Sequence, residues 1–243
     1  MTAEIVPPLS AAPEKLLAKA VPLRGLADAV NVTDAAGARV TMSSTAAASI
    51  LLNSGVEPVL QMTCRTRNRV AIEGDLIGKA ALGINNVLVL TGDDPTTGDE
   101  PESVMVNDLN SQGGVAIAKR MRDEGVIPSG RSIEPAPDLF LGVADSPIDP
   151  KPDWQPKSLL DKAEAGANFV QTQFCFDVAP LRRYMAVLAN LGLTDNLSFP
   201  IGVGSIASLR SAPWMHDHLS GLTVPDSNIQ RLLGAGDRKA EGV

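Results

Sequence analysis

Apolar, strand-like runs in the first 93 residues each end in a polar or acidic residue at nearly constant spacing. The residues that end these runs are Glu4, Thr33, Thr63 and Asp93, which lie 29, 30 and 30 residues apart. A parallel strand must be followed by a crossover connection, usually a helix, and one such unit takes about 30 residues. The pattern therefore predicts successive βα units whose strand ends share one rim and one pocket.

Start and stop signals along the chain place helices between these strands. A helix begins well at Pro13, because a proline in the first turn loses no hydrogen bond. Ser43 and Gly55 are the expected start and stop residues of a second helix. The polar, proline-rich stretch 92–112 is expected to be a long rim loop. The remaining patterns predict strands at 3–6, 27–33, 57–63, 85–91, 138–144, 168–174 and 198–204, and helices at 68–83, 114–124, 158–167, 179–192 and in the tail 225–243.

The length of 243 residues and the βα rhythm predict an α/β protein with the (β/α)8 TIM-barrel fold. Residues 1–243 are expected to form a single catalytic domain of this type. Only seven strands can be found, and no apolar run follows for the eighth. An open barrel leaves unpaired strand edges, which folded proteins avoid. Either the chain is truncated at its C-terminus, or another element, a second copy of the chain or a partner subunit covers the gap.

Charge and cysteine content exclude several classes of function. A net charge of −7 without a basic stripe argues against a nucleic-acid surface. The two cysteines, Cys64 and Cys175, form no CxxC motif, and histidines are few, so a catalytic metal is not expected. No signal segment and no apolar run of about 20 residues is present, which predicts a cytoplasmic protein without membrane contact.

Glu4 is the candidate acid of the first strand. An ionised carboxylate inside an apolar strand is costly unless it is paired or keeps its proton. A retained proton would make Glu4 a general acid at neutral pH. The alternative is a structural carboxylate that is satisfied by a neighbouring arginine or a backbone N–H group.

Three further positions could carry chemistry. Asp93 ends the fourth strand, although Gly-Asp-Asp-Pro is also a common turn sequence. Gln171 and Gln173 point to opposite faces of their strand, and the amide of the one that faces the interior could bind a ligand ring with donor and acceptor edges, or pair with a loop carbonyl. Lys162 could contact a phosphate, since barrels bind phosphates through rim loops and helix N-termini. The chain has no GxGxxG or GxxxxGK[ST] motif, so a Rossmann fingerprint and a P-loop are unsupported.

Five motifs in the expected order resemble the methylenetetrahydrofolate reductase family, and in particular its bacterial forms that consist of the catalytic barrel alone. The motifs are TAEIVPP, AVNVTD, PVLQMTCRTRNR, VLVLTGDDP and AGANFVQTQFCFD, and the similarity runs from Thr2 to about Trp214. The resemblance implies an FAD-containing barrel that reduces 5,10-methylenetetrahydrofolate to 5-methyltetrahydrofolate in one-carbon metabolism and methionine biosynthesis. NADH, NADPH or a partner protein would supply the electrons.

The resemblance also implies roles for individual residues. Glu4 matches the general acid that protonates N10 of the folate, and Asp93 matches the carboxylate near flavin and pterin. Gln173 matches a glutamine that contacts folate and nicotinamide. The positions that match FAD-lining residues are Thr33, Gln61, Thr91, Gly92, Asp93, Asp145 and Lys162.

The chain departs from the family pattern at three places. Leu9 and Ser10 follow the two prolines where many members have Arg and Gly, Gln61 replaces a frequent His, and Thr91 replaces a frequent Arg. These changes are expected to weaken FAD binding or to shift its redox potential. A non-catalytic subunit that binds folate or flavin within a larger complex is the alternative. A barrel aldolase or hydrolase would need a Schiff-base lysine or a metal cluster, and the sequence suggests neither.

Overall fold

The computed structural model describes residues 1–206, 215, 222 and 224–235 of the chain. The chain divides into two compact units, which are described separately. The first unit comprises Met1–Val143 and Asp161–Asn168, and the second comprises Ala144–Leu160 and Phe169–Val243. A single catalytic domain stays a prediction.

Strands and helices alternate along the described residues, as the spacing predicts. The strands are β1 (Thr2–Ile5), β2 (Ala29–Val32), β3 (Pro58–Thr63), β4 (Asn86–Leu90), β5 (Phe140–Asp145) and β6 (Phe169–Thr172). The α-helices are α1 (Pro13–Ala20), α2 (Ser44–Asn53), α3 (Arg69–Ala81), α4 (Ser111–Glu124), α5 (Lys157–Ala165), α6 (Val178–Asn190), α7 (Leu193–Asn196) and α9 (Asp226–Gly234). Three short 3-10 turns are η1 (Val21–Leu23), η2 (Ala36–Ala38) and η3 (Pro95–Thr97).

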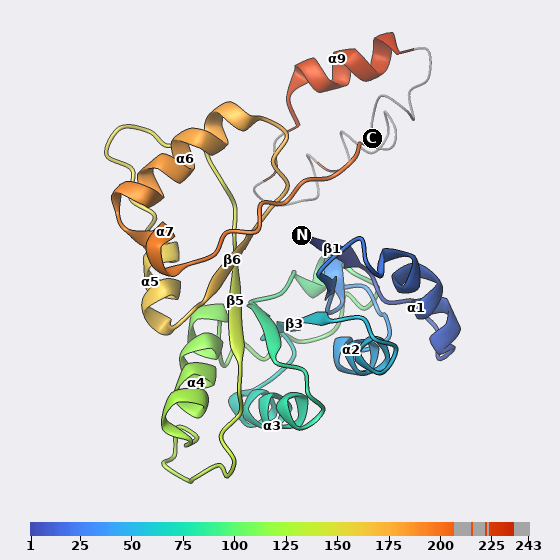
Figure 1. Cartoon of the computed structure of the whole chain (residues 1–243), viewed down its shortest axis with the longest axis vertical. Coiled ribbons are helices and arrows are strands. Elements are labelled where there is room, and N and C mark those ends of the chain that lie inside the picture. Colours follow the sequence, from blue (N-terminus) through green and yellow to red (C-terminus); the bar gives the residue numbers. More distant parts are fainter. Residues whose placement is uncertain (207–214, 216–221, 223, 236–243) are drawn as a thin grey trace. The chain divides into compact units, whose positions relative to one another are not determined.

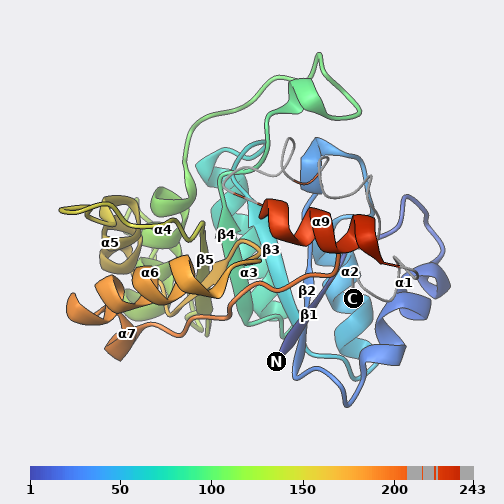
Figure 2. The same ribbon diagram turned by 90° about the horizontal axis from the view of Figure 1, so that it is seen from above.

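Local capping chemistry explains where the helices of the first unit begin. Helix α1 begins at Pro13, as predicted. The side chains of Ser43, Asn68 and Asn110 each accept a backbone N–H from the first turn of α2, α3 and α4. The cap at Asn110 starts α4 three residues earlier than predicted, because it places Ser111 and the following glycines inside the helix. In Figure 2 the green segment between β4 and α4 extends away from the strands, as expected for a rim loop.

The six strands form one sheet in the order β1-β2-β3-β4-β5-β6, and each neighbouring pair from β1 to β5 is parallel. This order confirms the predicted α/β class and matches the first six strands of a (β/α)8 barrel. Glu4 is in register with Asn31, Val32 with Leu60, and Gln61 with Leu88. Because strand neighbours in register share a face, this pairing decides which side chains point the same way.

The two faces of β1, β2 and β3 differ in polarity. One face carries apolar side chains, and Ile5, Val30 and Val32 on it pack against α1 and α2. In Figure 1 these two helices lie next to one another beside the strands. The opposite face carries Thr2, Glu4, Asn31, Thr33, Val59, Gln61 and Thr63, which we call the polar face.

The predicted seventh strand, 198–204, is not a continuous strand. It makes two isolated parallel bridges, Phe169 to Ser198 and Phe174 to Gly202. Pro200 interrupts the ladder because it has no N–H to donate. Within the predicted tail helix, α9 covers Asp226–Gly234, and residues 236–243 lie outside the described residues. Among the described helices, none combines the length and the apolar character needed to cross a membrane.

The apolar face predicts a clear stability difference between two truncations. Leu51 is completely buried in the cluster under α1 and α2. Leu51→Ala should lower the free energy of unfolding by about 2–5 kcal/mol, because it leaves a cavity. Val70→Ala, at an exposed position of α3, should change it by less than about 0.5 kcal/mol. Equal effects in urea unfolding would contradict the assignment of the core.

Candidate active site

Glu4 and Gln61 meet on the polar face, although β2 runs between their strands. The Gln61 Nε2 amide donates a hydrogen bond of 3.0 Å to Glu4 Oε2. Gln61 is buried, while the side chain of Glu4 is exposed. The amide therefore fixes the orientation of a carboxyl group that remains accessible.

Two buried polar atoms lie on the same face. Thr33, at the end of β2, is 2% exposed, and its Oγ1 has no hydrogen-bond partner among the described residues. Asn31 donates from Nδ2 to Thr2 Oγ1 at 3.1 Å, while its Oδ1 lacks a partner in the same part of the chain. Buried polar groups are nearly always hydrogen-bonded. The polar face therefore offers donor and acceptor atoms that suit a polar ligand.

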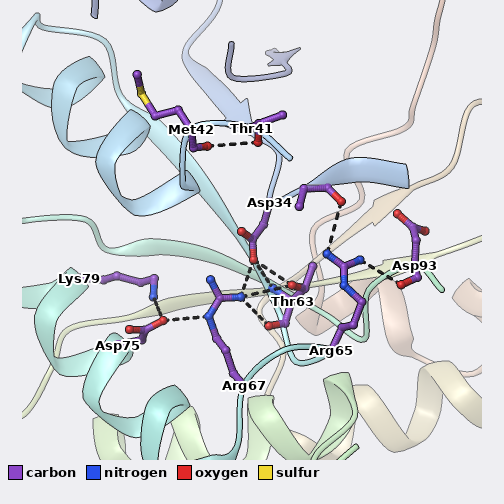
Figure 3. Close-up of polar contacts among 10 residues, drawn as sticks. Asp34, Thr41, Met42, Thr63, Arg65, Arg67, Asp75, Lys79 and Asp93 are labelled. Carbon is purple, nitrogen blue, oxygen red and sulfur yellow. Dashed lines mark hydrogen bonds and ion pairs between the residues drawn. The ribbon is translucent and has the colours of Figure 1, made fainter. Parts of the chain in front are cut away.

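A network of charges connects the ends of β2 and β3 with helix α3, as Figure 3 shows. Asp34 Oδ2 accepts hydrogen bonds of 2.9 Å from both the backbone N and the Oγ1 of Thr63. It also accepts one of 2.7 Å from Arg67 Nη1. Arg67 Nε donates to Asp75 at 3.0 Å, and Lys79 Nζ lies 3.1 Å from the same carboxylate oxygen. This network ties the two strand ends together.

The charged members of the network respond to burial and to their partners. Burial raises the pKa of Asp34, but Arg67 and the Thr63 bonds outweigh it and lower the pKa overall. The pKa of Arg67 is raised, because Asp34 and Asp75 outweigh its burial. Burial dominates at Lys79 and lowers its pKa, in spite of Asp75. Asp34 is thus held in its ionised form.

The end of β4 brings three predicted residues to the rim. Thr91 Oγ1 accepts a hydrogen bond of 3.3 Å from Ser111 N, at the start of α4. Gly92 has a φ of 99°, which side-chain-bearing residues rarely adopt. The exposed Asp93 accepts a 2.7 Å bond from Gly37 N through Oδ2. Thr91, Gly92 and Asp93 thus follow β4 directly, and bonds to the start of α4 and to the loop after β2 hold Thr91 and Asp93.

The second unit contains two of the predicted residues, and they are neighbours. The backbone N of Gln173 donates to the carbonyl of Asp145 at 2.9 Å. Gln173 Oε1 accepts a bond of 3.0 Å from Phe174 N. Asp145 Oδ2 also accepts a hydrogen bond from the hydroxyl of Tyr184. Burial, followed by this bond, raises the pKa of Tyr184, so the hydroxyl keeps its proton.

Lys162, Cys64 and a surface cavity are the remaining features to describe. Lys162 is in the last turn of α5. Burial raises the pKa of Cys64 to about 11, so its thiol is not a nucleophile at neutral pH. A surface cavity of about 610 Å³ is lined by none of the predicted site residues, but by Leu9, Ser10, Ala11, Thr41, Met42, Ser43, Ala46 and Ile50.

Asp34, Arg65 and Arg67 belong to the rim but were not among the sequence candidates. The signal was present in TCRTRNR, where two arginines follow a buried strand at a spacing of two. Asp34 directly follows Thr33, which matches an FAD-lining position of the family. The bonds that join Asp34 to Thr63 and Arg67, and Arg65 to Ala35 and Asp93, span 28–33 residues, so local pattern alone could not assign them.

Comparison with known proteins gives a consistent family. The family model described as methylenetetrahydrofolate reductase matches residues 1–241. A probable methylenetetrahydrofolate reductase (NADPH) of Caenorhabditis elegans is 29% identical over 161 residues, which are 65% of this chain and 22% of that protein. Methylenetetrahydrofolate reductase 2 of Schizosaccharomyces pombe is 28% identical over 205 residues, which are 80% of this chain and 31% of that protein. The chain thus spans less than a third of the length of either relative.

A solved structure supports the fold. It is a Clostridium thermocellum protein that binds two copies of 5-methyl-5,6,7,8-tetrahydrofolic acid. Its TM-score to this chain is 0.66, with 14% identity, and the match covers 99% of this chain and 77% of that one. At this identity, the likeness is evidence for a shared fold.

The charge network predicts a pH-dependent contribution of Asp34 to stability. Because folding lowers its pKa, the contribution is complete above the unfolded-state value and is lost as pH falls through the folded-state value. The difference in unfolding free energy between the wild type and Asp34→Asn should be constant above about pH 5. It should shrink below the ordinary value of 3.8. Asp138→Asn, at an exposed position, is the control. If the difference in unfolding free energy between the wild type and Asp34→Asn did not change with pH, Asp34 would not be a stabilising carboxylate of this network.

Proposed function

Since the chain belongs to the methylenetetrahydrofolate reductase family, we propose that it reduces 5,10-methylenetetrahydrofolate to 5-methyltetrahydrofolate with FAD as cofactor. The observation that carries the proposal is the Glu4–Gln61 pair on the polar face, because it presents an oriented acid beside unpaired polar atoms. Reduction of this folate needs an acid, since the departing N10 must be protonated as the five-membered ring opens. Glu4 is the only acidic residue of β1.

Glu4 would hold the proton and deliver it to N10. Gln61 Nε2 donates to Oε2, and a carboxyl oxygen can accept this bond whether the group is ionised or protonated. The proton would then reside on Oε1. Ring opening by this proton leaves an iminium carbon that can accept a hydride.

Asp93 would stabilise the positive charge that develops on the folate. Its carboxylate is held by Gly37 N, so it need not reorganise during the reaction. Gln173 would orient the folate ring through its amide, as the family resemblance suggests.

Bound FAD, once reduced, would supply the hydride. The polar face fits the edge of a flavin ring, because Thr33 Oγ1 and Asn31 Oδ1 are buried atoms that need hydrogen-bond partners. We propose that FAD is held by the family-matched positions Thr33, Gln61, Thr91, Gly92, Asp93, Asp145 and Lys162. NADH or NADPH would be the electron donor, and a cytoplasmic location would suit these substrates.

A non-catalytic subunit that binds folate or flavin is the second candidate. It is favoured by Thr91, whose Oγ1 is engaged with Ser111 where many family members carry an arginine. The absorption spectrum of the purified protein after incubation with FAD separates the two. Bound oxidised flavin together with folate-dependent reoxidation supports the reductase, whereas folate binding by a colourless protein that takes up no FAD supports the subunit.

If Glu4 is the general acid, its substitution should slow folate reduction and leave flavin reduction intact. Glu4→Gln should slow folate reduction by about 10²- to 10⁴-fold, because the general acid is gone. Reduction of the flavin by NADH or NADPH should continue, since that step needs no proton from Glu4. Stopped-flow measurement of the two half-reactions tests this, with Glu14→Gln on α1 as the control. An equal loss in both halves would assign Glu4 to structure or to cofactor binding.

The Asp93 assignment predicts effects on both halves of the reaction. Asp93→Asn should lower the rate of folate reduction by about 10²- to 10³-fold and should shift the flavin potential, because one fixed negative charge is removed. Asp94→Asn is the matched control, since Asp94 is the adjacent exposed carboxylate and, in the described part of the chain, its side chain bonds to Thr96 within its own turn. Unchanged potential and unchanged folate reduction would remove Asp93 from the site.

A further inference from the structure

Arg65 is a buried cation at the rim that the proposed mechanism does not use. It lies two residues beyond the end of β3, and its side chain is 5% exposed. Its Nη1 donates to the backbone carbonyl of Asp93 at 3.0 Å, and its Nη2 donates to that of Ala35 at 3.4 Å (Figure 3). One guanidinium therefore joins the loop after β2 to the loop after β4.

The same two loops are joined a second time by Asp93 itself. Its Oδ2 accepts the 2.7 Å bond from Gly37 N. The turn that supplies this N–H has φ values of 50° at Ala35, 63° at Gly37 and 54° at Ala38. Alanine disfavours this left-handed region, so the turn persists only where surrounding contacts hold it. The Arg65 bond to Ala35 is one of these contacts.

Gly92 allows Arg65 to pack directly on the backbone that precedes Asp93. A Cβ atom at Gly92 would lie 2.8 Å from Arg65 Cβ and 3.3 Å from Arg65 Nη1, in addition to the φ of 99°. The carbonyl of Arg65 also accepts a 2.9 Å bond from Val106 N, near the far end of the same long loop. Arg65 thus contacts both ends of the segment that carries Asp93.

We propose that Arg65 is a positioning residue for Asp93. Its guanidinium fixes the Asp93 backbone and the Ala35–Ala38 turn together, so that Gly37 N meets the Asp93 carboxylate and aims it. The two carbonyls are bonded by separate nitrogens of one planar guanidinium, a geometry that the single nitrogen of lysine does not reproduce. The kinetic consequence rests on the proposed function, whereas the structural consequence does not.

Amide hydrogen exchange tests the structural consequence without any activity. In Arg65→Met the Gly37 N–H should exchange at least about tenfold faster, because its acceptor is no longer held in place. Arg65→Lys, which keeps one bond, should give an intermediate rate. Amides of the α2 core, such as that of Leu51, should be unchanged. The Gly37 rate should also be unchanged in the control Arg120→Met, which removes an arginine that bonds to Glu124 and to the carbonyl of Pro128.

Kinetics of the holoenzyme test the functional consequence. Arg65→Met should lower kcat for folate reduction by about 10- to 100-fold, as small misplacements of a catalytic group do. It should leave KM within about threefold. In an Asp93→Asn background the same substitution should cost less than about threefold, because residues that act as a unit are not additive.

The outcomes separate the two proposals. Faster Gly37 exchange in a protein that reduces no folate supports the positioning role and rejects the proposed function. Unchanged Gly37 exchange overturns the positioning role, whatever the activity. Full additivity with Asp93→Asn overturns it as well, since Arg65 would then act through another group. If Arg65→Met fails to fold, Arg65→Lys decides by the same exchange and kinetic criteria.

Discussion

The alternation of side chains across a parallel sheet is the constraint on which the candidate site depends. On β1, β2 and β3 one face must be apolar, because Ile5, Val30 and Val32 pack against helices. Every residue in register with Glu4 then points the other way, toward the polar face. A shift of one residue in β1 would turn Glu4 toward the helices and Ile5 away from them, so packing energy fixes the orientation of Glu4.

Buried charges at this rim are tolerated because they are paired. The cost of burying Asp34 is offset by three hydrogen bonds, and Arg67 is shared between Asp34 and Asp75. Arg65 is satisfied differently, through two backbone carbonyls. These bonds hold the rim loops against the ends of the strands, and a reacting group needs such support to keep its geometry.

Two departures from the family pattern, Gln61 and Thr91, can be understood from the hydrogen bonds that these residues make. Gln61 stands where the family often has histidine, and it donates to Glu4. An amide does not titrate near neutral pH, whereas an imidazole does. Gln61 is therefore a hydrogen-bond donor to Glu4 at every physiological pH. Because the amide is uncharged, it does not take up the proton that Glu4 is proposed to deliver. Thr91, in place of an arginine, bonds to the start of α4 and leaves Arg65 as a buried cation beside Asp93.

Local sequence determined the elements and the candidates at their ends. Proline and serine signals place α1 and α2, and the period of about 30 residues places the first four strands, because these features are visible along the chain without any knowledge of tertiary contacts. Pro13 begins α1 and Ser43 caps α2, so these local signals predicted both helix starts correctly. The family motifs added Gln61 and gave Glu4 and Asp93 their expected roles.

Only the tertiary structure decided how those residues are partnered. The bond from Gln61 to Glu4 spans 57 positions and crosses an intervening strand, so it depends on the register of three strands at once. Thr33 was a candidate, yet its neighbour Asp34 receives the bonds from Thr63 and Arg67. The interruption at Pro200 likewise turned an apparent seventh strand into two bridges. Long-range hydrogen bonds are satisfied by whichever groups the packed backbone brings within reach, and no local pattern specifies that distance.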